Sequence, residues 1–142
     1  MILLKTRFVQ VEYHAEVPCI QNTHLCPVLG KDFRASVDKV LELYQKLKKD
    51  HRELFWLADT RKFGVMAADD QEWLLKDWNV RAYKAGVRYV GFIVPENIFG
   101  ELSIKKYNDN VSQQETFETR IFENANNARE WFKSLAAAQV LK

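Results

Sequence analysis

LFWLA, residues 54–58, is apolar at every position and shows no alternation between apolar and polar side chains. A strand that is covered on both faces has this pattern, and such strands belong to parallel sheets. VRYVGFIV, residues 87–94, is a second near-continuous apolar run, and Pro95 ends it. The two runs therefore predict neighbouring parallel strands at the centre of an α/β fold.

Helices are predicted before and after the first run along the chain. Residues 33–47 place apolar side chains at helical spacing, and Asp32 precedes them as an expected N-cap. Between the two runs, Asp69 and Glu72 resemble a capping box that opens a second helix. Gly86 is placed to end this second helix in the left-handed conformation.

The remaining segments complete an alternating pattern. An antiparallel hairpin is expected over residues 6–26, because its apolar side chains alternate and prolines flank its second strand. A weaker helix over 102–111, a strand over 117–122 and a helix capped by Asn124 follow the second run. This order predicts one domain over residues 1–142, with a mixed, mostly parallel sheet of about five strands and helices packed on it.

Composition excludes several classes of protein. The 142 residues are 47% hydrophobic, with 21 basic against 19 acidic side chains divided evenly along the chain, so no basic footprint for nucleic acid is present. No apolar run approaches the roughly 18 residues of a membrane span, and Lys5 interrupts the apolar start too early for a signal peptide. Two cysteines are too few for a secreted disulfide framework, so we expect a cytoplasmic protein.

The carboxyl ends of the two predicted parallel strands are the first place to look for a site, because ligands of open α/β sheets bind there. The first strand ends at Asp59, and Pro95 follows the second. We expect a partner or ligand surface formed by Asp59, Thr60, Arg61, Lys62, Asp69, Asp70, Trp73, Glu96, Asn97 and Phe99.

Asp59 has two interpretations. As a phosphoacceptor or magnesium ligand it would need further carboxylates and a lysine at the same sheet edge, and the second strand supplies no lysine there. The simpler interpretation is that Asp59 pairs with Arg61 or caps its own turn, and we favour it. 

Metal, cofactor and catalytic sites are not indicated. His14, Cys19, His24 and Cys26 are zinc-type ligands, but strand parity places Cys19 opposite His24 and Cys26. No nucleotide-binding glycine motif or nucleophile elbow is present. We therefore expect no metal, no cofactor and no enzymatic activity. The four tryptophans are expected mostly in the core.

Three segments resemble a known family. WLADTRKFGVMAADDQEWL (56–74), GVRYVGFIVPENIFGELS (86–103) and RIFENANNAREWF (120–132) are similar to STAS-like domains related to bacterial anti-sigma-factor antagonists. The resemblance is strongest to small stand-alone members in Bacteroidetes-type bacteria. It implies a regulatory module that binds a protein partner, normally switched by phosphorylation of a serine at the start of the helix after the DTR segment. Residues 66–70, MAADD, carry no hydroxyl at that place, so the switch is expected to be lost.

Two further expectations concern partners. A related branch of this architecture carries lipids beneath a mobile helix. The alternative function is therefore to carry a small apolar ligand. The lid residues would be Phe99, Leu102, Ile104 and Tyr107. The hairpin leaves an edge strand, which can pair with a second copy of the chain in a homodimer. A magnesium-dependent phosphoacceptor at Asp59 ranks last.

Overall fold

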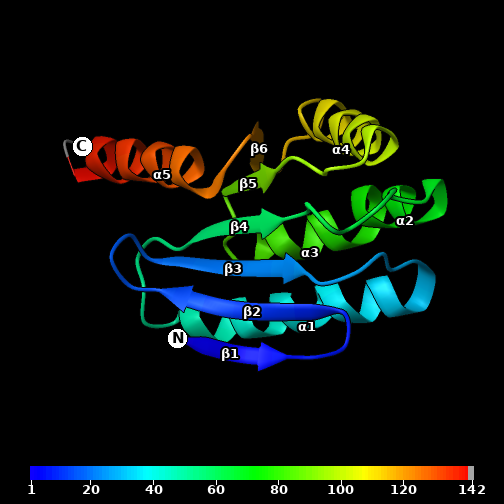
Figure 1. The fold of residues 1–142 in the computed structure, drawn as a ribbon. Coiled ribbons are helices and arrows are strands. Elements are labelled where there is room, and N and C mark those ends of the chain that lie inside the picture. Colours follow the sequence, from blue (N-terminus) through cyan, green and yellow to red (C-terminus); the bar gives the residue numbers. More distant parts are fainter. Residues whose placement is uncertain (141–142) are drawn as a thin grey trace.

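The computed structural model describes residues 1–140, which form one six-stranded sheet flanked by helices (Figure 1). The strands lie side by side in chain order, from β1 to β6. Their bounds are β1 Ile2–Lys5, β2 Val9–His14, β3 Cys19–His24, β4 Phe55–Asp59, β5 Tyr89–Ile93 and β6 Glu118–Phe122. The helices are α1 Gly30–Lys48, α2 Ala68–Trp73, the π-helical turn η1 Leu74–Trp78, α3 Asn79–Lys84, α4 Ile98–Val111 and α5 Ala125–Val140.

The sheet is mixed, as the sequence predicts. β1, β2 and β3 pair antiparallel, whereas β3, β4, β5 and β6 pair parallel. The two apolar runs are adjacent parallel strands, with Trp56 opposite Val90 and Ala58 opposite Phe92. The α/β class and the N-terminal hairpin are therefore confirmed.

The strand count differs from the prediction because β1 is an additional strand. β1 pairs with the outer edge of β2, and β4 pairs with the outer edge of β3. Both hairpin strands therefore lie inside the sheet. The expectation that the hairpin leaves a free edge is therefore wrong, and β1 and β6 are the two edges. Homodimer formation stays a prediction, without the hairpin edge that suggested it.

Helices cover the two faces unequally (Figure 1). The helices between β3 and β6 pack on one face, where they form the larger core with side chains such as Val11, Trp56 and Phe92. Connections of one hand between successive parallel strands place all their helices on the same face. α5 packs on the other face and forms a smaller core with Phe55, Leu57 and its own Phe132.

Two of the predicted helix caps are wrong. α1 begins at Gly30, whose φ of +60° suits glycine, and its N-cap is Leu29 rather than Asp32. The backbone N–H of Gly30 instead donates to Asp70 at 2.9 Å, so the cap comes from a distant segment. The Asp69 and Glu72 capping box also does not form, since Ala67 is the N-cap of α2 and makes no side-chain cap.

Three other helix ends follow from local chemistry. Gly86 has φ +108° directly after α3, as predicted, and the Asn124 side chain accepts from the N–H of Asn127 at 2.9 Å. α4 begins four residues earlier than predicted, because the side chain of Asn97 accepts from the N–H groups of Phe99 and Gly100. This unforeseen cap brings the start of α4 to the carboxyl end of β5.

Candidate functional site

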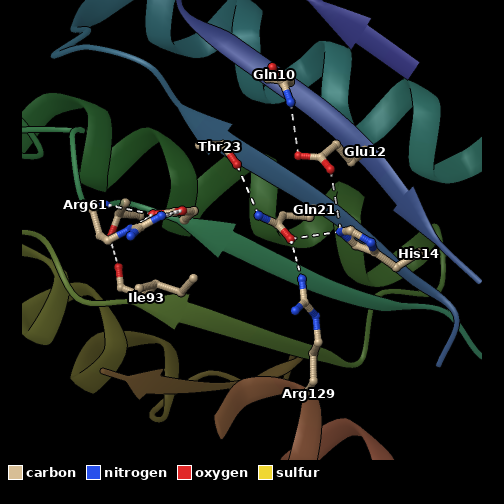
Figure 2. Close-up of polar contacts among 10 residues, drawn as sticks. Gln10, Glu12, His14, Gln21, Thr23, Arg61, Ile93 and Arg129 are labelled. Atoms are coloured by element: carbon tan, nitrogen blue, oxygen red, sulfur yellow. Dashed lines mark hydrogen bonds and ion pairs between the residues drawn. The ribbon is translucent and has the colours of Figure 1, made fainter. Parts of the chain in front are cut away.

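The carboxyl ends of β4 and β5 carry the predicted Asp59–Arg61 pair (Figure 2). Arg61 donates through Nε and Nη2 to both oxygens of Asp59, with the shortest distance 2.8 Å to Oδ2. The N–H of Arg61 also donates to Asp59 Oδ1 at 3.2 Å, so the carboxylate caps its own turn as well. These hydrogen bonds, together with the charge of Asp59, raise the pKa of the Arg61 guanidinium. The Asp59 side chain is only 3% exposed, while that of Arg61 is 57% exposed.

This geometry favours the ion-pair interpretation of Asp59. Both carboxylate oxygens accept from Arg61, and the Asp59 side chain is only 3% exposed, so it is poorly accessible to a phosphoryl donor. Asp70 lies against α1 rather than beside Asp59, and it accepts there from Arg34. The structure thus gives no support to a phosphoacceptor at this position.

Backbone contacts fix the loops that follow the two strands. The Thr60 hydroxyl and the Thr60 N–H both donate to the carbonyl of Ile93, and the N–H of Glu96 donates to the carbonyl of Arg61 at 3.1 Å. Thr60 is buried, whereas Glu96 is exposed. The loops are therefore joined to each other, and they hold Arg61 at the surface above the sheet edge.

Exposed apolar side chains gather next to Arg61. Ile98, Phe99 and Leu102 on the first turns of α4 are 59%, 66% and 55% exposed. Val65, in the adjoining loop, is 44% exposed. The loop and the helix touch directly, because a Cβ on Gly100 would overlap the carbonyl oxygen of Gly64. We refer to Val65, Ile98, Phe99 and Leu102 together as the apolar patch.

The other predicted site residues divide into two groups. Lys62 is exposed in the loop after β4, and Asn97 is the cap of α4. The remaining three lie toward α1. Asp70 is buried and accepts from Gly30 and Arg34, whereas Asp69 is exposed. The half-buried ring of Trp73 has the guanidinium groups of Arg34 and Arg81 within about 6 Å of its centroid. The structure therefore brings the predicted site residues of segments 59–62 and 96–99 together. Asp69, Asp70 and Trp73 lie apart from them.

A small cavity lies between the sheet and the helices, beneath α4. Its volume is about 50 Å³, and α4 contributes Ile104 and Tyr107 to its wall. Two of the four predicted lid residues thus face this cavity, while Phe99 and Leu102 face solvent. The complete lining is Asn22, His24, Phe33, Val37, Trp56, Ala58, Thr60, Phe63, Met66, Leu74, Trp78, Val90, Phe92, Ile104, Tyr107 and Phe117.

His24 lies in this wall, although the sequence suggested it only as a zinc-type ligand and not as a residue of an apolar cavity. It is 4% exposed and packs against the rings of Phe33 and Phe63. Burial lowers its pKa to about 4, with nearby Asp59 opposing the change. The imidazole is therefore neutral at pH 7. A histidine that ends a strand gives no signal in the sequence that its ring faces a cavity.

Polar side chains also cover the half of the sheet that α5 leaves bare (Figure 2). Gln21 on β3 accepts from His14 at 3.0 Å and from Arg129 of α5 at 3.2 Å. Cys19, on the same face, is buried, and burial raises the pKa of its thiol to about 12. The thiol is thus kept protonated and unreactive.

Two larger open clefts lie away from the predicted edge. One, of about 770 Å³, is at the amino ends of the parallel strands and includes Lys48, Arg88 and Tyr89. The other, of about 780 Å³, lies between the β2–β3 turn and α5 and includes His14 and Arg129. Both are lined by charges of both signs, so neither indicates a particular ligand.

Within residues 1–140, no three histidine, cysteine, aspartate or glutamate side chains gather as metal ligands would. None of the helices described over that range is long and apolar enough to cross a membrane. Comparison with protein-family models, with curated proteins and with solved structures finds no match to this chain.

Proposed function

We propose that this chain is a non-catalytic binding module whose protein partner docks on the carboxyl edge of β4 and β5. The observation that carries the proposal is the apolar patch beside Arg61. Three of its members are more than half exposed, and contiguous exposed apolar side chains mark interaction surfaces. Kinship with the STAS-like domains is part of this proposal, and it rests on the sequence segments alone.

Arg61 gives the surface a polar anchor. Its pairing with buried Asp59 holds the guanidinium in one orientation, so little side-chain entropy remains to be lost on binding. Arginine is among the residue types enriched in the hot spots that dominate binding energy at interfaces. Phe99, at 66% exposure, is the largest apolar side chain available to a partner here.

A pull-down from cells that make the protein tests this proposal. Wild-type chain should retain a partner that the Phe99→Ala, Leu102→Ala double variant loses, and Arg61→Ala should weaken its retention. Val80→Ala is the matched control, because Val80 is an exposed apolar residue on α3, outside the patch. Equal retention by all four proteins, or no partner at all, would contradict the proposal.

The second candidate function is the binding of a small apolar ligand in the cavity beneath α4. The observation that favours it is the lining itself, in which apolar and aromatic side chains from the sheet meet Ile104 and Tyr107 of α4. An apolar cavity of 150 Å³ takes up benzene, so about 50 Å³ requires α4 to shift before a ligand of that size enters.

Native mass spectrometry of the purified protein tests this second candidate. A co-purified small molecule that is released on denaturation is the expected result. A mass equal to that of the bare chain, obtained from several preparations, would count against it.

A further inference from the structure

The hydrogen bonds behind the cavity fix the orientation of Asn22. The indole Nε1–H of Trp56 donates to Asn22 Oδ1 at 2.6 Å. An indole nitrogen can only donate, so this atom of Asn22 must be the carbonyl oxygen. The amino group of Asn22 therefore points to Nε2 of His24, at 3.3 Å.

Asn22 in turn determines where His24 carries its proton. The amino group of Asn22 only donates, so Nε2 of His24 must accept and cannot hold a hydrogen. A neutral imidazole has one proton, which must then reside on Nδ1. Burial, by lowering the pKa of His24 to about 4, keeps the ring in this neutral state at physiological pH.

This Nδ1–H is a donor without an acceptor. Nδ1 is buried and has no hydrogen-bond partner. The other polar groups in the cavity wall are occupied: Thr60 donates to Ile93 and Tyr107 donates to Asn79 at 2.6 Å. Among the described residues that line the cavity, His24 alone has a buried polar side-chain atom without a partner. Such a group costs stability until an acceptor reaches it.

We propose that the cavity binds a small, neutral, mainly apolar molecule whose acceptor oxygen takes the Nδ1–H of His24. This inference rests on the second candidate function and specifies its ligand. A carbonyl or ether oxygen fits, because it accepts without bringing a proton that needs a further partner. The cavity wall contains no charged side chain when His24 is neutral, so a carboxylate or phosphate would be buried without a counter-ion.

Entry of such a molecule depends on α4, which polar contacts attach to α2 and to the loop before α2. Asn110 donates to Gln71 at 2.8 Å, and Ser103 accepts from the N–H of Met66 at 3.0 Å. These hydrogen bonds can exchange for bonds to water while α4 shifts, and the buried Ile104 and Tyr107 must then give up part of their apolar contacts. α4 is therefore the wall through which the cavity opens.

Two isosteric probes test the proposal. Cyclohexanone and methylenecyclohexane have nearly the same shape, but only the first carries an acceptor oxygen. Binding is followed by tryptophan fluorescence, because Trp56 and Trp78 both line the cavity. Cyclohexanone should bind about tenfold more tightly, as one added hydrogen bond of typical net strength predicts. The preference should vanish in His24→Phe and persist in His14→Phe, a matched change outside the cavity.

The outcomes separate this inference from the function on which it rests. Equal binding of both probes would overturn the role of His24 and leave ligand binding in place. Binding of neither probe would overturn both. Since His24→Phe changes a core residue, ¹⁵N NMR of the wild-type imidazole provides a second measurement. A proton on Nδ1 is expected, and a proton on Nε2 would overturn the proposal.

Discussion

At the scale of single residues, His24 should make stability depend on pH. The unfolded chain protonates this histidine near pH 6.5, whereas the folded chain does so only near pH 4, since burial lowers the pKa. Between these values the unfolded state binds more protons, so stability is lost as the pH falls from 6.5 to 4. The full loss in the free energy of unfolding is about 3 kcal/mol.

Urea unfolding at a series of pH values measures this effect. His24→Gln should remove most of the slope between pH 4 and 6.5, because glutamine takes up no proton in that range. His14→Gln, the same substitution on the half-exposed sheet face, is the matched control. Identical slopes in wild type and His24→Gln would show that the burial of His24 does not determine it.

Single residues also show what the sequence could and could not predict at the site. The Asp59–Arg61 pair was predictable, because the two residues are neighbours along the chain and one turn is enough to join them. The cap at Asp32 was wrong because the N-terminus of α1 is capped by Asp70, forty residues away in the sequence. The cap at Asp69 was wrong because α2 begins earlier, with Ala67 as its N-cap. The unpartnered nitrogen of His24 depends likewise on Asn22 and Trp56, which only the folded sheet brings together.

At the scale of elements, Asp70 joins α2 to the start of α1. It accepts from the N–H of Gly30 at 2.9 Å and from Arg34 Nε at 3.0 Å, and its side chain is 3% exposed. Asp70→Ala should lower the free energy of unfolding by about 1–3 kcal/mol, because a partly buried N–H and a guanidinium lose their acceptor. Asp69→Ala removes a neighbouring carboxylate that is exposed, and should change stability by less than about 0.5 kcal/mol. Urea unfolding of both variants decides the matter, and equal effects would contradict this role of Asp70.

The contact between α4 and the loop after β4 depends on Gly100. A Cβ at this position would overlap the carbonyl oxygen of Gly64, a backbone atom that cannot turn aside. Gly100→Ala should therefore displace α4 from the loop and cost about 1–3 kcal/mol, despite the higher helix propensity of alanine. Thermal unfolding measures the loss, and Lys106→Ala, an exposed position on α4, is the control. A stabilised Gly100→Ala protein would mean that the two segments do not touch as described.

Elements with strong periodicity were predicted well, and the others were not. The apolar runs of β4 and β5 and the amphipathic pattern of α1 fixed their type, although α1 begins three residues before residue 33. β1 was missed because its four residues, Ile2–Lys5, are three apolar side chains followed by a lysine and show too little alternation to identify a strand. The first turn of α4 was missed because its apolar residues face solvent, which is opposite to the usual pattern.

At the scale of the whole molecule, the sheet has one fully covered face and one that is covered only in part (Figure 1). The side taken by the helices between parallel strands follows from the hand of the connections. α5 has no strand after it in the described chain, so no such rule predicts its side. Its position over β4, β5 and β6 leaves the polar face of β2 and β3 open, with Arg129 at the boundary.

Both proposals concern the same end of this molecule, where α4 meets the ends of β4 and β5. Its outer side presents the apolar patch, and its inner side closes the cavity. A partner that contacts Phe99 and Leu102 would thus touch the helix through which the cavity opens. The protein surface and the ligand site are tested separately, because their residues do not overlap.

Site-specific photo-crosslinking tests the central claim most directly. A benzoylphenylalanine placed at position 99 should capture a protein partner in cells, and the same residue at position 80 should not. Capture at position 99 should fall when Arg61→Ala is added. Crosslinks of equal yield at positions 99 and 80, or none at position 99, would contradict a docking surface at the carboxyl edge of β4 and β5.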